Sequence, residues 1–260
     1  MKKPSFWSWL WIAIAAAYFL LPLIATGEFS LRAQKDTYSL LAYQRVVADP
    51  KFVASFLFSF EIALITIVVG LLLVTPTAFW VRLRLPHLRR LIEFISLLPL
   101  VIPAVVLVFG LIRIYGKPPI QLVSSPILLV IGNIVFALPY LYRSVDVGLR
   151  AIDVNTLTEA AQSLGARLPT ILFKVILPNL RVALLSGAFL TFAIVMGEFT
   201  MASLLVWPAF GPYMQLLSSS KVYEPSAVAI LSFLLTWMCT GVIQLIGRRA
   251  PEQTQIAGAR

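Results

Sequence analysis

Residue types that build disulfide frameworks and metal sites are scarce in this sequence of 260 residues. It has one cysteine, Cys239, which lies in an apolar run, and one histidine, His87, which lies in a basic loop. A single cysteine excludes an intramolecular disulfide framework. Zinc-type sites need several cysteine, histidine or carboxylate ligands, and the sequence shows no such cluster. One histidine in a basic loop also leaves no nucleophile–histidine pair for covalent catalysis.

Charged residues are scarce as well. They make up 12% of the chain, whereas hydrophobic residues make up 60% and the mean hydropathy is +0.91. Soluble globular domains have about 45–50% apolar residues, so this composition is typical of a polytopic membrane protein. The formal net charge of +10 does not indicate nucleic-acid binding, because the basic residues fall in short runs between apolar segments.

The sequence also lacks a phosphate-binding loop of the form Gly-x-x-x-x-Gly-Lys-Ser/Thr. Such a loop holds the phosphates of a bound nucleotide with its backbone N–H groups. If this chain takes part in ATP-driven transport, the ATPase is therefore a separate chain, and ATP and Mg belong to that partner. We expect no cofactor in this chain, and a membrane-embedded enzyme is the least favoured interpretation.

Six apolar runs are each about long enough to cross a bilayer, which takes about 20 helical residues. Tryptophans cluster at the start of the first run, as aromatic residues do at a membrane interface. A cleaved signal peptide is the alternative for that run, because Lys2 and Lys3 precede it and small residues follow it. The sequence predicts an all-α fold with six transmembrane helices, at about residues 6–25, 52–81, 91–112, 126–142, 176–206 and 225–247.

An even number of spans places both termini on the same side of the membrane. The termini and the loops at 82–90 and 143–181 contain 14 of the 21 lysines and arginines, and the other three loops contain 7. Since cytoplasmic loops carry the excess of Lys and Arg, we predict that both termini and the 143–181 loop are cytoplasmic. No internal repeat or long linker is visible, so residues 1–260 are expected to form one domain.

The 143–181 loop contains a short amphipathic segment. Leu157, Ala160, Ala161, Leu164 and Leu168 recur with the period of a helix. A helix of this kind between membrane spans must cover its apolar side with lipid headgroups, its own bundle or another protein.

Local signals predict where this helix begins and ends. Thr156 followed by Glu159 has the spacing of a capping box. Pro169 disfavours helical geometry at Leu168. The predicted helix therefore covers about residues 156–168, and at roughly 20 Å it is too short to span a bilayer.

The same stretch carries a recognisable pattern. Glu159-Ala160-Ala161 is followed by Gly165 and then, twelve residues later, by Leu177-Pro178. This pattern resembles the EAA loop in the permease subunits of bacterial ABC importers, although Val175 stands where the pattern usually has isoleucine. The resemblance extends from about residue 38 to about residue 247.

The resemblance implies that the amphipathic helix is a coupling helix that docks on a cytoplasmic ATPase, with Glu159, Ala160, Ala161 and Gly165 as the docking residues. It implies four partners: an ATP-binding subunit dimer, a second and non-identical permease subunit, an extracytoplasmic solute-binding protein and the lipid of the bacterial inner membrane. Glu159 can at the same time serve the capping box. Gly165 weakens a helix by roughly 1 kcal/mol relative to alanine, so a turn or a close contact is expected there.

The resemblance also bears on the solute. Gly197-Glu198-Phe199-Thr200 in a short one-chain permease looks most like the polyamine-type group, near the spermidine/putrescine permeases. The expected solute is small and polar, such as spermidine or putrescine, with an aminophosphonate or another small polar or charged solute as the alternative. A stand-alone secondary transporter or channel is the alternative from another class, and it would need coupling-ion residues inside the membrane and often internal repeats.

Two glutamates, Glu61 and Glu198, lie inside predicted spans. A charge at the bilayer centre costs from about 2.5 kcal/mol upward, so such residues usually face the bundle interior or water. Each is a satisfied carboxyl, a carboxyl close enough to the membrane surface to reach water, or part of a cation-attracting substrate path. Asp146 has a simpler interpretation, since Arg143 and Arg150 flank it at i−3 and i+4 and predict a local ion-pair set.

Overall fold

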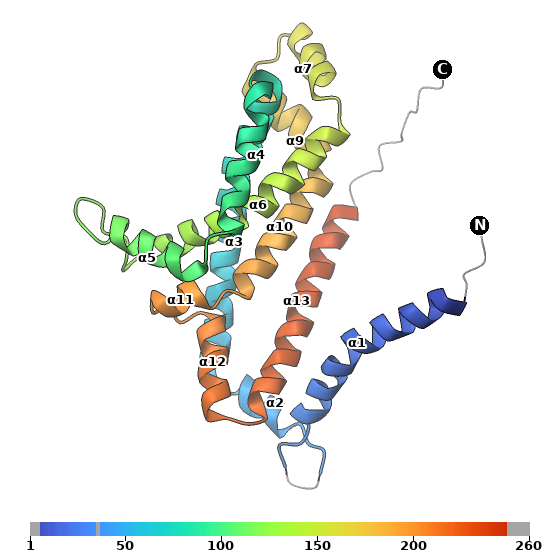
Figure 1. The fold of residues 1–260 in the computed structure, drawn as a ribbon, viewed down its shortest axis with the longest axis vertical. Coiled ribbons are helices and arrows are strands. Elements are labelled where there is room, and N and C mark those ends of the chain that lie inside the picture. The colour runs from blue at the N-terminus through green and yellow to red at the C-terminus, as the bar shows by residue number, and fades with distance from the viewer. Residues whose placement is uncertain (1–5, 35–36, 249–260) are drawn as a thin grey trace.

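Apart from an isolated bridge between Gln34 and Thr37, the regular structure in residues 6–34 and 37–248 is helical; these are the residues that the computed structural model describes (Figure 1). This confirms the predicted all-α class. The helices in chain order are α1 Phe6–Ser30, α2 Leu41–Val47, α3 Pro50–Arg84, α4 Arg89–Leu97, α5 Ala104–Tyr115, α6 Pro126–Ala151, α7 Val154–Ser163, α8 Leu168–Ile171, α9 Leu177–Asn179, α10 Arg181–Met196, α11 Thr200–Leu204, α12 Phe210–Ser220 and α13 Glu224–Arg248, with 3-10 turns at Pro86–Leu88 and Leu98–Leu100 and a π turn at Leu172–Ile176.

The two longest central helices begin with matching local signals. The Asp49 carboxylate accepts a hydrogen bond from Lys51 N at 2.9 Å, and Pro50 takes the first position of α3. The Ser125 hydroxyl accepts one from Ile127 N at 3.3 Å, and Pro126 takes the first position of α6. An N-cap acceptor followed by proline suits a helix start, because proline has no N–H to leave unpaired.

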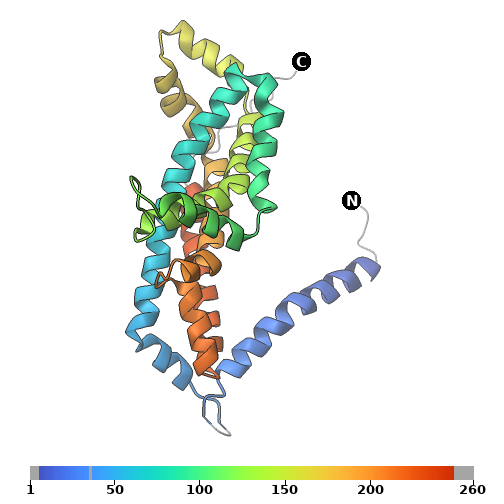
Figure 2. The ribbon, with the colours of Figure 1, turned by 60° about the vertical axis from the view of Figure 1, so that its left-hand side comes forward.

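Helices α3, α6 and α10 form the centre of the bundle and pack most extensively against one another. A middle cluster joins them to α5 and α11. A second cluster joins α3 and α6 to α7 at one end of the molecule, and a third joins α2, α12 and the start of α13 at the other end. We call these the α7 end and the α12 end (Figures 1 and 2).

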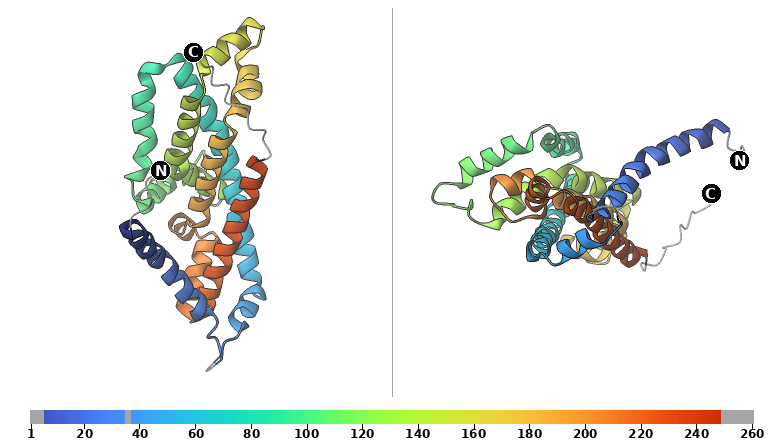
Figure 3. Two further views of the ribbon diagram at one scale, coloured as in Figure 1. Left: turned by 90° about the vertical axis from the view of Figure 1, so that its right-hand side faces the viewer. Right: turned by 90° about the horizontal axis from the view of Figure 1, so that it is seen from below.

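Helix α1 diverges from this bundle. The C-terminal part of α1 packs against α13, and the N-terminal part of α1 points away from the bundle (Figure 3). Its apolar window has no buried residue, and Trp7 and Trp11 are both more than 60% exposed. An apolar helix of this length has to be covered by lipid or by another membrane protein.

Three of the described helices are long and apolar enough to cross a membrane: α1 (its residues Trp9–Ser30), α3 and α6. Two bent pairs raise the number to as many as five. The apolar stretch Glu224–Cys239 of α13 is shorter than a full span, so six spans stay a prediction.

The bent pairs differ from two of the predicted spans. The segment predicted as a span at 91–112 is broken after Leu100, and the two parts meet at 102°. Pro99 and Pro103 flank this break, where proline removes a helical hydrogen bond and crowds the preceding turn. The segment predicted at 176–206 bends by 78° near Leu180, and its regular helix ends at Met196.

Candidate functional site

Helix α7 stands at one end of the molecule, at the opposite end from α2 and α12 (Figure 1). Asp153 caps its first turn, since the carboxylate accepts hydrogen bonds from Thr156 N at 3.1 Å and from Thr156 Oγ1 at 2.7 Å. The bonds from Thr156 hold the pKa of the Asp153 carboxyl below its usual range. The predicted capping box is therefore wrong: the helix begins two residues earlier, at Val154, its N-cap is Asp153, and Thr156 donates to that cap.

The end of α7 also differs from the prediction. The helix stops at Ser163 rather than at Leu168, and Gly165 takes the left-handed conformation at φ +81°. Gly165 N donates to the Gln162 carbonyl at 2.8 Å, and Ala166 N donates to the Ala161 carbonyl at 3.0 Å. A glycine in this conformation closes a helix without steric cost and satisfies its last carbonyls. Gly165, four residues before Pro169, thus forms the predicted turn and ends the helix.

The two faces of α7 have different environments. Val154, Thr158 and Ala161 are at most 9% exposed and pack on the chain's own core. Glu159 and Ala160 lie on the exposed face, and Gly165 is exposed beyond its end. The four residues implied as docking residues therefore divide into an exposed set of three and Ala161, which serves internal packing.

The chain that follows α7 returns it to the bundle. Ile171, Leu172 and Ile176 are buried in the cluster that also contains Ala161 and residues of α3 and α6. The Leu177-Pro178 pair of the recognised pattern begins the short helix α9, immediately before the bend that leads to α10. Helix α7 and the segment after it are therefore packed against the central helices α3 and α6.

A buried carboxylate organises the charges at the α7 end. Asp146 of α6, 6% exposed, accepts hydrogen bonds from Arg150 Nε at 2.7 Å and Arg89 Nη2 at 3.2 Å, and Arg82 Nη1 lies 3.9 Å away. The predicted ion pair with Arg150 is confirmed, whereas the one with Arg143 is wrong, because that side chain points to the exposed face of α6. Sequence reasoning missed Arg82 and Arg89, whose only signal was membership of a basic run after the second apolar segment.

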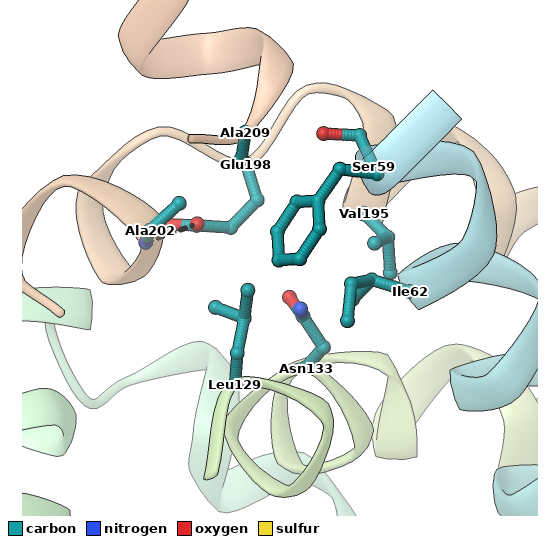
Figure 4. Close-up of a pocket in the computed structure, with 9 residues that line it drawn as sticks. Ser59, Ile62, Leu129, Asn133, Val195, Glu198, Ala202 and Ala209 are labelled. Carbon is teal, nitrogen blue, oxygen red and sulfur yellow. Dashed lines mark hydrogen bonds between the residues drawn. The ribbon is translucent and has the colours of Figure 1, made fainter. Parts of the chain in front are cut away.

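Glu198 lies in the break between α10 and α11. Its carboxylate accepts hydrogen bonds from Met201 N at 2.6 Å and Ala202 N at 3.0 Å, so it caps the five-residue helix α11 (Figure 4). It also lines a small pocket where α3, α6, α10 and the 198–209 segment meet. The pocket is lined by Phe58, Ser59, Ile62, Leu129, Asn133, Val195, Glu198, Ala202 and Ala209.

The other lining residues set what this pocket can hold. Its cavity volume of about 10 Å³ is room for a single water molecule. Asn133 is 1% exposed, and its Oδ1 has no hydrogen-bond partner, while Ser59 Oγ accepts a bond from Phe210 N at 2.8 Å. Sequence reasoning missed Asn133, although an asparagine inside an apolar run is a visible signal.

Glu61 does not join Glu198 in this pocket. It lies on the exposed side of α3, whereas its neighbours Ile62 and Ala63 are buried in the middle cluster. The structure therefore separates the two glutamates that the sequence singled out: one caps a helix and the other faces outward. Among the described residues, no group of three or more His, Cys, Asp or Glu side chains could hold a metal ion.

Residues 67–250 match the family described as "Binding-protein-dependent transport system inner membrane component". The chain belongs to this family. Members are transport subunits of the membrane and not enzymes, and the ATPase of the importer is a separate chain. The family implies an ATPase and a binding protein as partners and a multi-pass location in the inner membrane, and it removes the stand-alone transporter and the embedded enzyme as interpretations.

Individual relatives agree on the family and differ in solute. The molybdenum transport system permease protein ModB of Mycobacterium tuberculosis is 28% identical over 95% of this chain and 96% of its own. The spermidine/putrescine transport system permease protein PotB of Escherichia coli is 27% identical over 66% of this chain and 67% of its own. A chain of a bacterial ABC transporter that imports the acidic polysaccharide alginate has the same fold, with a TM-score of 0.73 at 18% identity, over 94% of this chain and 99% of that one.

Proposed function

We propose that this permease subunit docks on its ATPase through the exposed face of α7, with Glu159, Ala160 and Gly165 in the contact. The observation that carries the proposal is the division of α7 into a face packed in the bundle and a face that is exposed among the described residues. Ala161 acts from the inner face, where it joins α7 to α3 and α6. ATP and Mg belong to the ATPase, and this chain needs no cofactor of its own.

The rest of the assembly is part of the same proposal. The subunit has six spans with both termini cytoplasmic, and it forms half of a translocation path. The other half comes from a second, non-identical permease, beside an ATPase dimer and an extracytoplasmic binding protein. The outward position of Glu61 on α3 supports a second membrane subunit, and the exposed apolar surface of α1 is compatible with either lipid or such a subunit.

The docking surface can be tested by charge reversal and by bulk. Glu159→Lys and Gly165→Phe should each abolish uptake and reduce co-purification of the ATP-binding subunit, because one reverses a contact charge and the other forces a side chain into a left-handed turn. Glu93→Lys is the matched control, since Glu93 is half exposed on α4 at the same end of the molecule. Normal uptake and normal association in both α7 variants would refute the docking role.

For the solute, we propose a small polar molecule and name a polyamine as the first candidate. The support is the sequence Gly197-Glu198-Phe199-Thr200 together with the Glu198 carboxylate, which lines a small pocket at the meeting point of α3, α6 and α10. A molybdate-like oxyanion is the second candidate, because the ModB relatives match nearly the whole chain. An aminophosphonate stays a further alternative.

Uptake by Glu198→Gln decides between these solutes only when several are compared. The substitution removes the charge, and it also weakens the cap of α11, since an amide nitrogen cannot accept the N–H bonds that the carboxylate accepts. We expect a marked loss of putrescine uptake in Glu198→Gln and a smaller loss in Glu61→Gln. If the wild-type protein takes up molybdate but not putrescine, the polyamine proposal is refuted. If Glu198→Gln loses uptake of both solutes equally, Glu198 has a structural role alone.

A further inference from the structure

Leu164 has the largest exposed fraction of any large apolar side chain in the described residues, at 90%. Many exposed apolar side chains in this protein lie on long apolar helices, where lipid covers them. Leu164 is different, because it follows the last residue of α7, in a segment too short to span a bilayer. Lipid tails therefore do not account for its exposure.

The local backbone holds Leu164 outward. It is the C-cap residue of α7, and Gly165 turns the chain away directly after it. Ala160 lies one helical turn earlier on the same side, since residues four apart on a helix are neighbours. The two side chains form an apolar strip on the exposed face of α7, next to Glu159.

Charge separates this surface from its surroundings. Residues 153–166 contain Asp153 and Glu159 and no lysine or arginine, whereas Arg150 and Arg167 stand at either side of the segment. The chain as a whole has a net charge of +10. An acidic helix with an apolar tip, carried on a basic protein, is complementary to an apolar socket with a basic rim.

We propose that Leu164 is the apolar anchor of the ATPase-docking surface: it inserts with Ala160 into an apolar socket on the ATP-binding subunit, and Lys or Arg at the rim of that socket faces Glu159. The inference rests on the proposed function and adds the residue that supplies most of the binding energy. Interfaces concentrate their energy in a few central, desolvated side chains, and a charge at the rim contributes less. Leu164 is thus the anchor, and Glu159 sets the orientation.

The test measures binding between the full-length permease, purified in detergent, and its ATP-binding subunit. That subunit is the chain that co-purifies with the tagged wild-type permease and hydrolyses ATP. Equilibrium dissociation constants are measured for wild type, Leu164→Ala, Leu164→Asp and Leu164→Met. We expect Leu164→Ala to weaken binding about tenfold or more, as loss of a hot spot does. Leu164→Asp should weaken it further, and Leu164→Met, which keeps an apolar side chain of similar volume, should stay close to wild type.

Two control variants separate the anchor from general surface effects. Leu216→Ala changes an exposed leucine on α12, at the far end of the molecule, and Phe173→Ala changes an exposed aromatic side chain at the α7 end. Both should bind within about twofold of wild type if the anchor is specific. Because Leu164 is almost fully exposed, its variants should unfold at the same temperature as wild type. If Leu164→Asp does not fold, the result for Leu164→Ala alone tests the proposal.

The outcomes distinguish the anchor from the docking proposal. If Leu164→Ala and Leu164→Asp bind like wild type while Glu159→Lys and Gly165→Phe lose binding, α7 docks without the anchor and the inference is overturned. If none of the α7 variants changes the dissociation constant, the docking surface itself is elsewhere and both proposals fail. A loss in Phe173→Ala as large as in Leu164→Ala would also overturn the assignment of Leu164 as the anchor.

Discussion

Asp146 brings together arginines from three parts of the chain. Arg82 lies in the last turn of α3, Arg89 begins α4, and Arg150 lies one turn further along α6 than Asp146. The Asp146 side chain is 9% exposed, whereas the side chains of the three arginines are 25%, 32% and 48% exposed. A buried acceptor with partly solvated donors is worth more than a surface ion pair, because removing it leaves guanidinium groups without their partner.

The first prediction concerns this carboxylate. Asp146→Asn keeps the shape and removes the charge, and we expect the free energy of unfolding to fall by about 2–3 kcal/mol, between the values for exposed and fully buried pairs. Thermal unfolding of the purified protein in one detergent measures it. Glu93→Gln is the matched control: Glu93 also faces Arg150, but at 3.8 Å and with 46% of its side chain exposed, so its loss should be small. Equal effects of the two substitutions would contradict the central role of Asp146.

At the scale of elements, the chain is closely packed at the break between α10 and α11. Glu198 caps α11 from within the break, and Val206, just after α11, takes a left-handed conformation at φ 59°. This conformation is uncommon for a β-branched residue and costs of order 1–3 kcal/mol. The start of α12 approaches the break so closely that a Cβ on Gly211 would lie 2.5 Å from the Glu198 carbonyl oxygen and 2.9 Å from Phe199 Cα.

The second prediction uses two glycines in helices. Gly211→Ala should destabilise the protein by about 1–3 kcal/mol, because the added methyl group meets backbone atoms that have no side-chain freedom to move. Gly110→Ala in α5 is the control, since nothing lies within 4 Å of the new Cβ, and it should be neutral or stabilise by up to about 1 kcal/mol through helix propensity. Thermal unfolding of both variants measures the two changes in stability. If Gly211→Ala stabilises the protein, the contact between α12 and the break is looser than in this structure.

At the scale of the whole molecule, the two ends differ in chemistry. The α7 end gathers the Asp146 cluster and the exposed acidic face of α7. The α12 end is held by Arg45 of α2, which donates to the Glu224 carboxylate at 3.1 Å, and by Tyr213 of α12, which donates to the Asp49 carboxylate at 3.0 Å. Both contacts join segments far apart in sequence, so each end is a packed unit that the long central helices connect.

The third prediction is topological. In a Cys239→Ser background, single cysteines at Ser163 and at Lys117 should react with a membrane-impermeant maleimide from opposite sides of the membrane. Both positions are exposed in the structure. Lys117 is preferable to its neighbour Gly116, where a Cβ would contact the Ile112 carbonyl oxygen. Labelling of both cysteines from the same side would remove the cytoplasmic assignment of α7 and, with it, the docking proposal.

Much of this protein can be predicted from consecutive residues alone. The apolar runs give the all-α membrane class, because a bilayer admits few ways to satisfy a spanning backbone. Glu159-Ala160-Ala161, Gly165 and Leu177-Pro178 lead to the permease family, and Gly165 forms the turn that its residue type favours. These features depend on composition and on spacing within a few helical turns, so they are readable without a fold.

Only the tertiary structure decided the features that depend on which residues meet. It placed Ala161 against the core and left Leu164 bare, because the orientation of α7 is set by the helices on which it packs. It gave Asp146 the partners Arg82 and Arg89, more than fifty residues away, in place of Arg143. It made Glu198 a helix cap, because the chain breaks at Met196 and returns as α11. Pairings of this kind follow from packing in three dimensions, which the period and charge of a sequence do not specify.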